Sequence, residues 1–315
     1  MKKILSLICA ILFTNSLVLA QQYFGLNGFQ YRVIDNGSVA VWNCYNNQDT
    51  VIIPDVVMYN GEKYTVVAIE SGAFWGTDYI VSVIIPNTVT SIGQSAFREC
   101  ENLSSVVMPN SITNIGNAAF WGCSNLTSFT IPNSVTHIGA AIFGDCTNLT
   151  TLDYNARNCN GVSVGTYHPF SCSSISTINI GDDVEKLPEN FLYDMDNITT
   201  INFSNNITHI GKKAFAYYDG FTTLNLPDSI THIGEEAFLE CNNLSSIILP
   251  NNLSYIGIGA FKSCGSLSSI TIPNNVTRID DEAFEDCINL NSVDFLTNNL
   301  TYIGDYAFFT TAVEE

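Results

Sequence analysis

The chain has 315 residues, a formal net charge of −19 at pH 7 and only 13% charged residues. A nucleic acid or an anionic membrane surface is disfavoured as a partner, because either one requires a basic patch. The composition instead suits a polar, mostly uncharged surface that is exposed outside a cell.

Residues 1–20 have the pattern of a signal peptide. Lys2 and Lys3 precede an uncharged, apolar run from Ile4 to Leu19, and the small residue Ala20 ends it. The run is too short and wrongly flanked for a membrane anchor, which needs roughly 18 apolar residues. We therefore expect a mature chain that is secreted or attached to the cell surface, with no membrane insertion after the signal is removed.

Phenylalanine recurs along the rest of the chain, and most steps between successive members of the series are 23 residues. The series consists of Phe74, Phe97, Phe120, Phe143, Phe170, Phe191, Phe215, Phe238, Phe261, Phe284 and Phe308. A fixed period of this size indicates a solenoid, in which each unit buries its apolar face against its neighbours. The predicted fold is therefore a solenoid of about eleven repeats.

One repeat shows the elements expected in each turn of the solenoid. Residues 126–131 alternate apolar and hydroxyl side chains, which predicts a half-buried strand. Pro132 ends that strand because proline cannot donate to a strand ladder, and a second short extended segment and a glycine follow. Ala96 and Cys100, four residues apart in the preceding repeat, predict a short helical turn that faces the core.

The motif L-x-x-I-x-I-P-x-x-V-T-x-I-G-x-x-A-F-x-x-C-x-x-L resembles the BspA-type leucine-rich repeat, from about Tyr64 to the end. The resemblance implies an α/β-type leucine-rich-repeat solenoid with a parallel sheet on one face, in surface proteins commonly described as adhesins. It also implies an N-terminal β-hairpin cap over residues 21–63, before a solenoid over residues 64–315. The motif degenerates within residues 154–190, where one repeat is longer and lacks the proline turn.

Cysteine and histidine recur in step with the repeat, which favours packing over chemistry. Two stacks of cysteines at 23-residue spacing predict buried thiols, because equivalent side chains point in parallel and not at each other. A Cys159–Cys172 disulfide that braces the long repeat is the alternative left open for those two residues. The position of His209 and His232 also accepts serine, asparagine and tyrosine, so we predict no metal site.

No nucleophile elbow, phosphate-binding glycine loop or zinc-protease motif is present in the sequence. We therefore predict that the chain is not an enzyme and uses no cofactor. The remaining candidates for function are the side chains that each strand turns outward, because a solenoid displays them as continuous rows.

One outward row is uniformly Ser or Thr, whereas the next row varies in size, polarity and charge. Variation on a constant scaffold is what a recognition surface requires. The predicted ligand-binding row consists of Ile84, Val107, Thr130, Asp153, Asn179, Asn202, Asn225, Ile248, Thr271 and Asp294. The partner expected there is an extracellular protein or glycan, with the irregular region 154–190 as a second candidate site. The alternative hypothesis is a non-catalytic spacer without a specific ligand.

Overall fold

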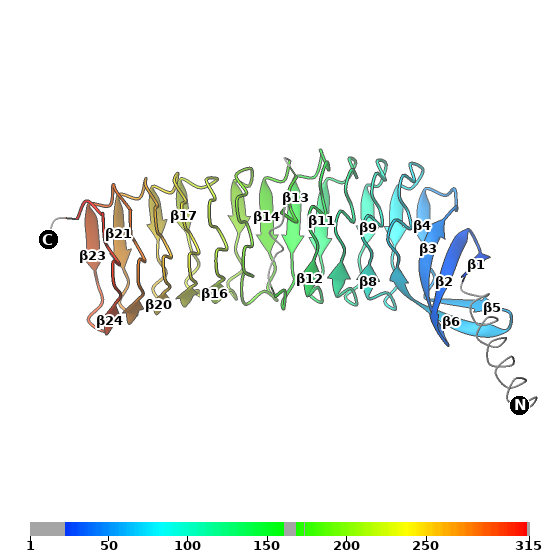
Figure 1. Ribbon diagram of the computed structural model, residues 1–315, viewed down its shortest axis with the longest axis horizontal. Helices are drawn as coiled ribbons and strands as arrows, with labels where there is room; N and C mark the ends of the chain where they lie inside the picture. Colours follow the sequence, from blue (N-terminus) through cyan, green and yellow to red (C-terminus); the bar gives the residue numbers. More distant parts are fainter. Residues whose placement is uncertain (1–22, 161–167, 173, 314–315) are drawn as a thin grey trace, which may run out of the picture.

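The computed structural model describes residues 23–160, 168–172 and 174–313. The signal peptide expected over residues 1–20 lies outside this part of the chain. The described chain forms an elongated β-solenoid of about eleven turns, with its two ends at opposite extremes of the molecule (Figure 1). This architecture confirms the solenoid that the 23-residue period predicts.

Two families of short strands line the solenoid. The sheet face is formed by β4 (Thr50–Ile52), β7 (Ser82–Ile84), β9 (Ser105–Val107), β11 (Ser128–Ile131), β13 (Thr151–Tyr154), β14 (Thr177–Ile180), β15 (Thr200–Asn202), β17 (Thr223–Asn225), β19 (Ser246–Ile248), β21 (Ser269–Ile272) and β23 (Ser292–Phe295). The second face carries the two-residue strands β8 (Ser91–Ile92), β10 (Asn114–Ile115), β12 (His137–Ile138), β16 (His209–Ile210), β18 (His232–Ile233), β20 (Tyr255–Ile256), β22 (Arg278–Ile279) and β24 (Tyr302–Ile303). All pairs within each face are parallel and in register, one repeat apart.

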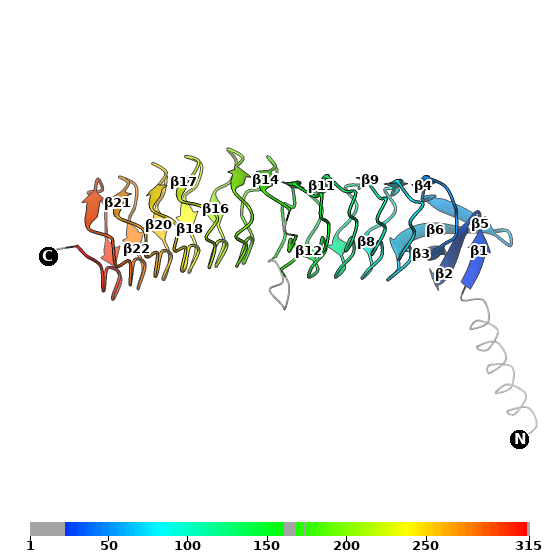
Figure 2. The ribbon, with the colours of Figure 1, turned by 90° about the horizontal axis from the view of Figure 1, so that it is seen from above.

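The N-terminal end is built differently, from longer and mostly antiparallel strands. These are β1 (Tyr23–Leu26), β2 (Phe29–Asp35), β3 (Ser38–Cys44), β5 (Val56–Tyr59) and β6 (Glu62–Ile69). Strands β1, β2 and β3 form an antiparallel meander, and β5 pairs antiparallel with β6. Strand β6 also pairs in parallel with β3 and β8, so it joins the N-terminal strands to the second face. Figure 2 shows these strands gathered at the blue end of the stack.

The core is a column of identical side chains along the solenoid axis. Strand β11 buries Phe129 and Ile131 and exposes Ser128 and Thr130, as its alternating pattern predicts. The recurring phenylalanines are buried and stack on one another, with ring centroids 5.1 Å apart for Phe238–Phe261 and for Phe261–Phe284. Each repeat therefore contributes the same packing unit. The residues that recur in every repeat stabilise the solenoid through this packing.

The short helical turn predicted between Ala96 and Cys100 is wrong, and the described chain contains no helix. The segment consists of consecutive tight turns, in which the N–H of Arg98 bonds to the carbonyl of Ser95 and that of Cys100 bonds to the carbonyl of Phe97. Ser95 and Glu99 have φ values of 53° and 58°, and a left-handed residue every fourth position interrupts a right-handed helix. Peptide groups that a helix would pair internally instead bond to the next turn of the solenoid, such as Phe97 N–H to the carbonyl of Ala119.

The glycine that follows most second-face strands allows close approach between turns. A Cβ at Gly139 would lie 2.4 Å from the backbone nitrogen of Asn117, well inside van der Waals contact. Positive φ values are carried instead by residues such as Ser95 and Ala118. Glycine is therefore favoured at this position because a side chain would clash with the backbone of the neighbouring turn.

The ladder of the sheet face is interrupted, whereas the turns themselves continue. Its strands form four separate hydrogen-bonded groups, which are β4-β7-β9, β11-β13-β14-β15, β17-β19 and β21-β23. Neighbouring turns remain joined through the second face, where β10 pairs with both β8 and β12. The interruptions therefore change the shape of the sheet face without ending the solenoid.

Candidate functional site

The ten residues of the predicted row all lie on the sheet face, but the interruptions divide them into four sets. Ile84 pairs with Val107, Asn225 with Ile248, and Thr271 with Asp294. The fourth set is continuous over four strands and consists of Thr130, Asp153, Asn179 and Asn202. The row is therefore a series of distinct patches and not one uniform strip.

The first patch is apolar and larger than the sequence analysis indicated. Ile52 of β4 pairs with Ile84, which in turn pairs with Val107. Ile52 is 62% exposed and Val107 is 51% exposed, and Ile84 is partly buried between them. Ile52 was missed because it precedes the first phenylalanine repeat, although the Val-Ile-Ile-Pro sequence at 51–54 matches the strand motif.

The second patch is a hydrogen-bonded polar ladder, here called the Asp153 ladder (Thr130, Asp153, Asn179 and Asn202). The Asp153 carboxylate accepts from Thr130 Oγ1 at 3.3 Å and from Asn179 Nδ2 at 2.7 Å. Asn202 Nδ2 then donates to Asn179 Oδ1 over 2.8 Å. Thr130 donates toward the C-terminal end, whereas Asn179 and Asn202 donate toward the N-terminal end, so the bonds converge on Asp153. These side chains therefore hold one another in fixed positions before any partner arrives.

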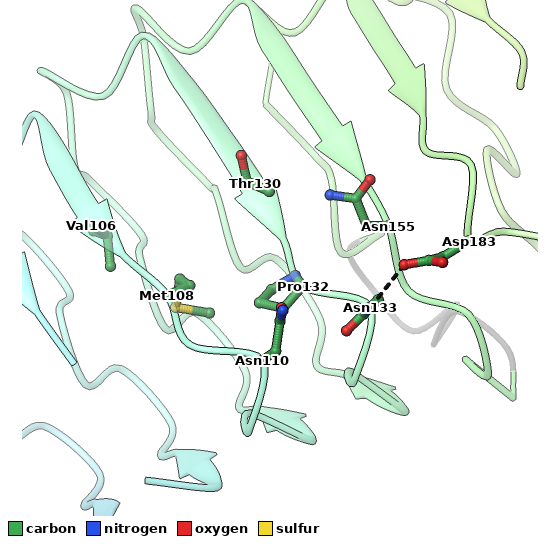
Figure 3. Close-up of a pocket in the computed structure, with 8 residues that line it drawn as sticks. All are labelled: Val106, Met108, Asn110, Thr130, Pro132, Asn133, Asn155 and Asp183. Atoms are coloured by element: carbon green, nitrogen blue, oxygen red, sulfur yellow. Dashed lines mark hydrogen bonds between the residues drawn. The ribbon is translucent and has the colours of Figure 1, made fainter. Parts of the chain in front are cut away.

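A groove of about 370 Å³ lies beside this ladder, at the interruption between β9 and β11 (Figure 3). We call it the β11 groove, and it is lined by Val106, Met108, Asn110, Thr130, Pro132, Asn133, Asn155 and Asp183. In Figure 3 Met108 and Pro132 lie on one side, and Asn155 and Asp183 lie on the other. Thr130 belongs to both the groove and the Asp153 ladder, so the two features form one continuous surface.

The core below the groove is packed differently from the core of the C-terminal turns. Phe129 occupies an inward position that holds Val83 and Leu152 in other turns, and its larger ring lies 4.8 Å from both Phe120 and Phe143. The Phe120 and Phe143 rings are consequently 6.2 Å apart, instead of the 5.1 Å of Phe261 and Phe284. One enlarged core residue therefore coincides with the separation of β9 from β11.

The irregular repeat supplies the far wall of the groove. Asn155 stands where the preceding repeat has Pro132, and its backbone N–H donates to the carbonyl of Ile131 at 3.1 Å, which proline could not do. Asp183 reaches back two turns, and its Oδ2 accepts from Asn133 Nδ2 at 2.8 Å. Sequence spacing gave no signal for Asn133 and Asp183, because the fold brings together residues 50 positions apart.

A second, smaller hollow of about 290 Å³ lies at the interruption between β19 and β21. Ile248, Leu249, Thr271, Pro273 and Leu296 are among the residues that line it. Ile248 is 61% exposed and contributes an apolar side chain to this end of the predicted row. Two members of the row, Ile248 and Thr271, therefore share one hollow although their strands are not paired.

The second face carries a row of planar side chains that sequence reasoning treated as a tolerant position. The His209 and His232 rings stack in parallel 4.4 Å apart, and each Nδ1 lies 2.8 Å from the hydroxyl of the preceding threonine. Partial burial, followed by the charge of His232, lowers the pKa of His209. Within the described chain, no three His, Cys, Asp or Glu side chains are grouped so as to hold a metal ion.

The cysteine stacks are buried thiols, as the spacing predicts, and each stacked thiol donates to a phenylalanine carbonyl oxygen of the preceding turn. Cys123 Sγ donates to Phe97 O at 3.1 Å, and Cys264 Sγ donates to Phe238 O at 3.0 Å. Cys172 likewise is a thiol that donates to Cys146 O at 2.9 Å, so the Cys159–Cys172 disulfide is wrong for this structure. Burial raises the pKa of Cys146 to about 12, which leaves its thiol protonated and unreactive.

These features define a class of protein, namely a parallel β-solenoid of leucine-rich repeats with a varied, grooved sheet face. The BspA type Leucine rich repeat region matches residues 67–164, 158–228 and 208–315 in six copies, and the chain belongs to this family. Solenoids of this family generally bind proteins or act at surfaces, and generally do so without enzymatic activity. The described part of the chain contains no helix that is long and apolar enough to cross a membrane.

Solved leucine-rich repeat structures with similar chains come from several bacteria. A leucine-rich repeat protein from Bacteroides ovatus is 24% identical over 91% of this chain and 92% of that chain, with a TM-score of 0.40. A leucine rich cell surface protein from Faecalibacterium prausnitzii is 21% identical over 93% of both chains, with a TM-score of 0.35. The pneumococcal vaccine antigen PcpA is 16% identical over 93% of this chain and 98% of that chain, with a TM-score of 0.39. A search of curated proteins finds no match.

Proposed function

We propose that this chain is a secreted or surface-attached binding protein, which recognises an extracellular protein or glycan in the manner of an adhesin. The recognition surface is the N-terminal half of the sheet face, from Ile52 to Asn202. The observation that carries the proposal is the junction of three different surfaces there, namely an apolar patch, the β11 groove and the Asp153 ladder. A repeat that served only stability would have no need to vary at this place.

The physical properties of the three surfaces support the proposal. Exposed Ile52 and Val107 offer apolar area that loses contact with water when a partner covers it. The Asp153 ladder is held by its own hydrogen bonds, so little conformational entropy is lost when its polar groups meet a partner. The net charge of −19 favours neutral or basic partners over acidic ones.

The test is a binding panel of extracellular matrix proteins and glycans, with a variant that changes Ile84→Ser, Val107→Ser and Asp153→Ala together. The matched control changes Asn114→Ala and His137→Ala, which lie on the second face of the same turns. We expect the sheet-face variant to lose at least about tenfold in affinity for the partner that the wild type binds, with the control unchanged. Equal binding by both variants would place recognition elsewhere on the molecule.

The alternative function is a spacer that projects or assembles without a specific ligand. A wild-type chain that binds nothing in the panel, and that self-associates in solution, would support the spacer and overturn the binding proposal. Secretion is tested separately, by labelling the surface of intact cells and by sequencing the N-terminus of the exported chain. A mature N-terminus directly after Ala20 would agree with the signal peptide expected over residues 1–20.

A further inference from the structure

We infer that the β11 groove binds a neutral pyranose residue of a glycan. The inference rests on the proposed function, because it assigns a ligand class to one part of the same sheet face. Three properties of the groove carry the inference, which are its size, the chemistry of its two walls and the absence of a basic side chain from the part of its lining that the structure describes.

The size of the groove suits one or two sugar rings. Its volume of about 370 Å³ falls at the lower end of the roughly 300–1,000 Å³ typical of small-molecule sites. Asn110 and Thr130 in its lining are exposed, so the groove opens on the sheet face. A terminal or internal ring of a longer chain can therefore enter while the rest of the glycan lies along the solenoid.

The two walls differ in the way that the surfaces of a pyranose differ. Val106, Met108 and Pro132 form an apolar wall, against which the C–H groups on the face of a sugar ring can pack. Asn155 and Asp183 stand opposite and can meet the hydroxyl groups at the ring edge. A site that is apolar on one side and bears a few convergent polar groups on the other is typical of small-ligand recognition.

The polar groups have the hydrogen-bonding capacity that hydroxyls require. A carboxamide both donates and accepts, as a hydroxyl does. The side-chain amides of Asn110 and Asn155 make no hydrogen bond within the described part of the chain, and Oδ1 of Asp183 likewise receives none there. These groups lie at the surface of the groove with donors and acceptors available for a ligand.

Charge selects the kind of sugar. Among the described residues, the lining includes one carboxylate, that of Asp183, and no lysine, arginine or histidine. A sulfated or carboxylated sugar would therefore meet a negative group without a cation to balance it, in a chain that is already strongly acidic. The groove accordingly favours uncharged hexoses over acidic ones.

The polar wall is also held in place before a ligand enters. Asn133 Nδ2 fixes one carboxylate oxygen of Asp183 at 2.8 Å. The Asn155 side chain lies against Gly181, where a Cβ would come within 1.9 Å of Asn155 Oδ1. Glycine at position 181 therefore leaves the space that the Asn155 amide occupies, and Gly181→Ala should displace that amide.

The methionines allow a direct test of where a sugar binds. Met108 lines the groove, Met58 is 57% exposed on the N-terminal strands and Met195 is buried. The mature chain, labelled with ¹³C at the methionine methyl groups, is titrated with methyl glycosides of glucose, mannose and galactose, and separately with sialyllactose. We expect at least one neutral glycoside to shift the Met108 resonance, with Met58 and Met195 unchanged and with no shift by sialyllactose.

Variants then test the polar wall by calorimetry or by the same titration. We expect Asp183→Ala and Asn155→Ala each to weaken binding of the active glycoside by about tenfold, because each removes hydrogen bonds to the ligand. Asp305→Ala removes an exposed carboxylate that lies outside both the row and the groove, and it is expected to leave binding unchanged. Gly181→Ala should weaken binding as Asn155→Ala does, with the Asp183–Asn133 contact intact.

The outcomes separate this inference from the proposed function. If no neutral glycoside shifts Met108, or if sialyllactose shifts it as strongly, the sugar inference is overturned. A protein partner whose binding is lost in the sheet-face variant but not in Asp183→Ala or Asn155→Ala would overturn the inference and leave the proposed function standing. No binding by any partner or sugar overturns both.

Discussion

The rings of Phe120 and Phe143, which occupy the same core position in successive turns, lie 6.2 Å apart at an angle of 28°. Phe261 and Phe284, in the same relationship, lie 5.1 Å apart and almost parallel at 5°. The difference arises because Phe129 inserts its ring edge between the first pair. A single core residue thus alters the stacking of two turns directly beneath the β11 groove.

The first prediction concerns this inserted ring. Phe129→Ala should lower the free energy of unfolding by about 3–5 kcal/mol, because it leaves a cavity between two buried rings. Phe309→Ala is the matched control, since Phe309 is 56% exposed and its loss should cost well under that amount. Urea denaturation of both variants gives the comparison. Equal losses would show that the Phe129 ring contributes little to packing.

The second prediction concerns the spacing of the turns. Gly139→Ala should destabilise the chain by about 1–3 kcal/mol, because its methyl group would lie 2.4 Å from Asn117 N. Gly265→Ala should have little effect, since its nearest neighbour would be Asn242 Oδ1 at 3.8 Å. Thermal unfolding of the two variants provides the measurement. An unaffected Gly139→Ala variant would mean that neighbouring turns separate at little cost.

Asp280 shows how one turn tolerates a side chain at that glycine position. Its carboxylate is almost fully buried, and it accepts from Tyr255 OH at 2.5 Å and pairs with Arg278 Nε at 2.5 Å. Those interactions offset the cost of burying the charge. Alanine at position 139 brings no such partners, so the prediction for Gly139 is not weakened by this exception.

The third prediction concerns pH and the buried His168. Phe170 N–H donates to His168 Nδ1 at 3.2 Å, and Nε2 lies 3.1 Å from Asn190 O, so the neutral ring is fully hydrogen-bonded. Burial lowers its pKa to about 4, below the usual 6.5. The unfolded chain therefore binds the additional proton first as pH falls. The stability from this group is present above pH 6.5 and is lost as pH falls toward 4, by about 3 kcal/mol in all.

Urea denaturation at pH 7 and pH 4.5 checks this linkage. His168→Gln should reduce the difference in unfolding free energy between the two pH values, because the group that titrates has been removed. His137→Gln serves as the control, since His137 is exposed on β12 and should leave the difference as in the wild type. An unchanged difference in His168→Gln would assign the acid sensitivity to other residues.

The fourth prediction concerns the thiol stacks. Burial raises the pKa of Cys100 to about 11 and that of Cys287 to about 12, so both remain protonated at pH 8. We expect iodoacetamide to modify the stacked thiols at least about a hundredfold more slowly in the native chain than in urea. Mass spectrometry of peptides after timed labelling measures the rates. Rapid native labelling of Cys123 or Cys264 would show that the turns open locally.

Much of this fold could be predicted from the sequence because a solenoid repeats a local solution. The 23-residue spacing of residues such as Phe238 and Phe261 was sufficient to predict a solenoid, and the alternation in residues 126–131 was sufficient to predict a strand. The predicted helical turn failed for a physical reason. Left-handed backbone at Ser95 and Glu99 is not visible in their side chains, and it sends N–H groups to the next turn instead of along a helix.

Some features of the candidate site could likewise be predicted from local sequence, whereas others depend on contacts between residues that are far apart in the chain. The sequence by itself determined which side chains face outward, and it placed Thr130, Asp153 and Asn179 in one row, because strand alternation is a local property. Only the tertiary structure decided that the row is divided into patches, and that Asn133 meets Asp183 across 50 positions. These features depend on how neighbouring turns stack around Phe129 and Gly181, and stacking depends on contacts between turns that no single repeat contains.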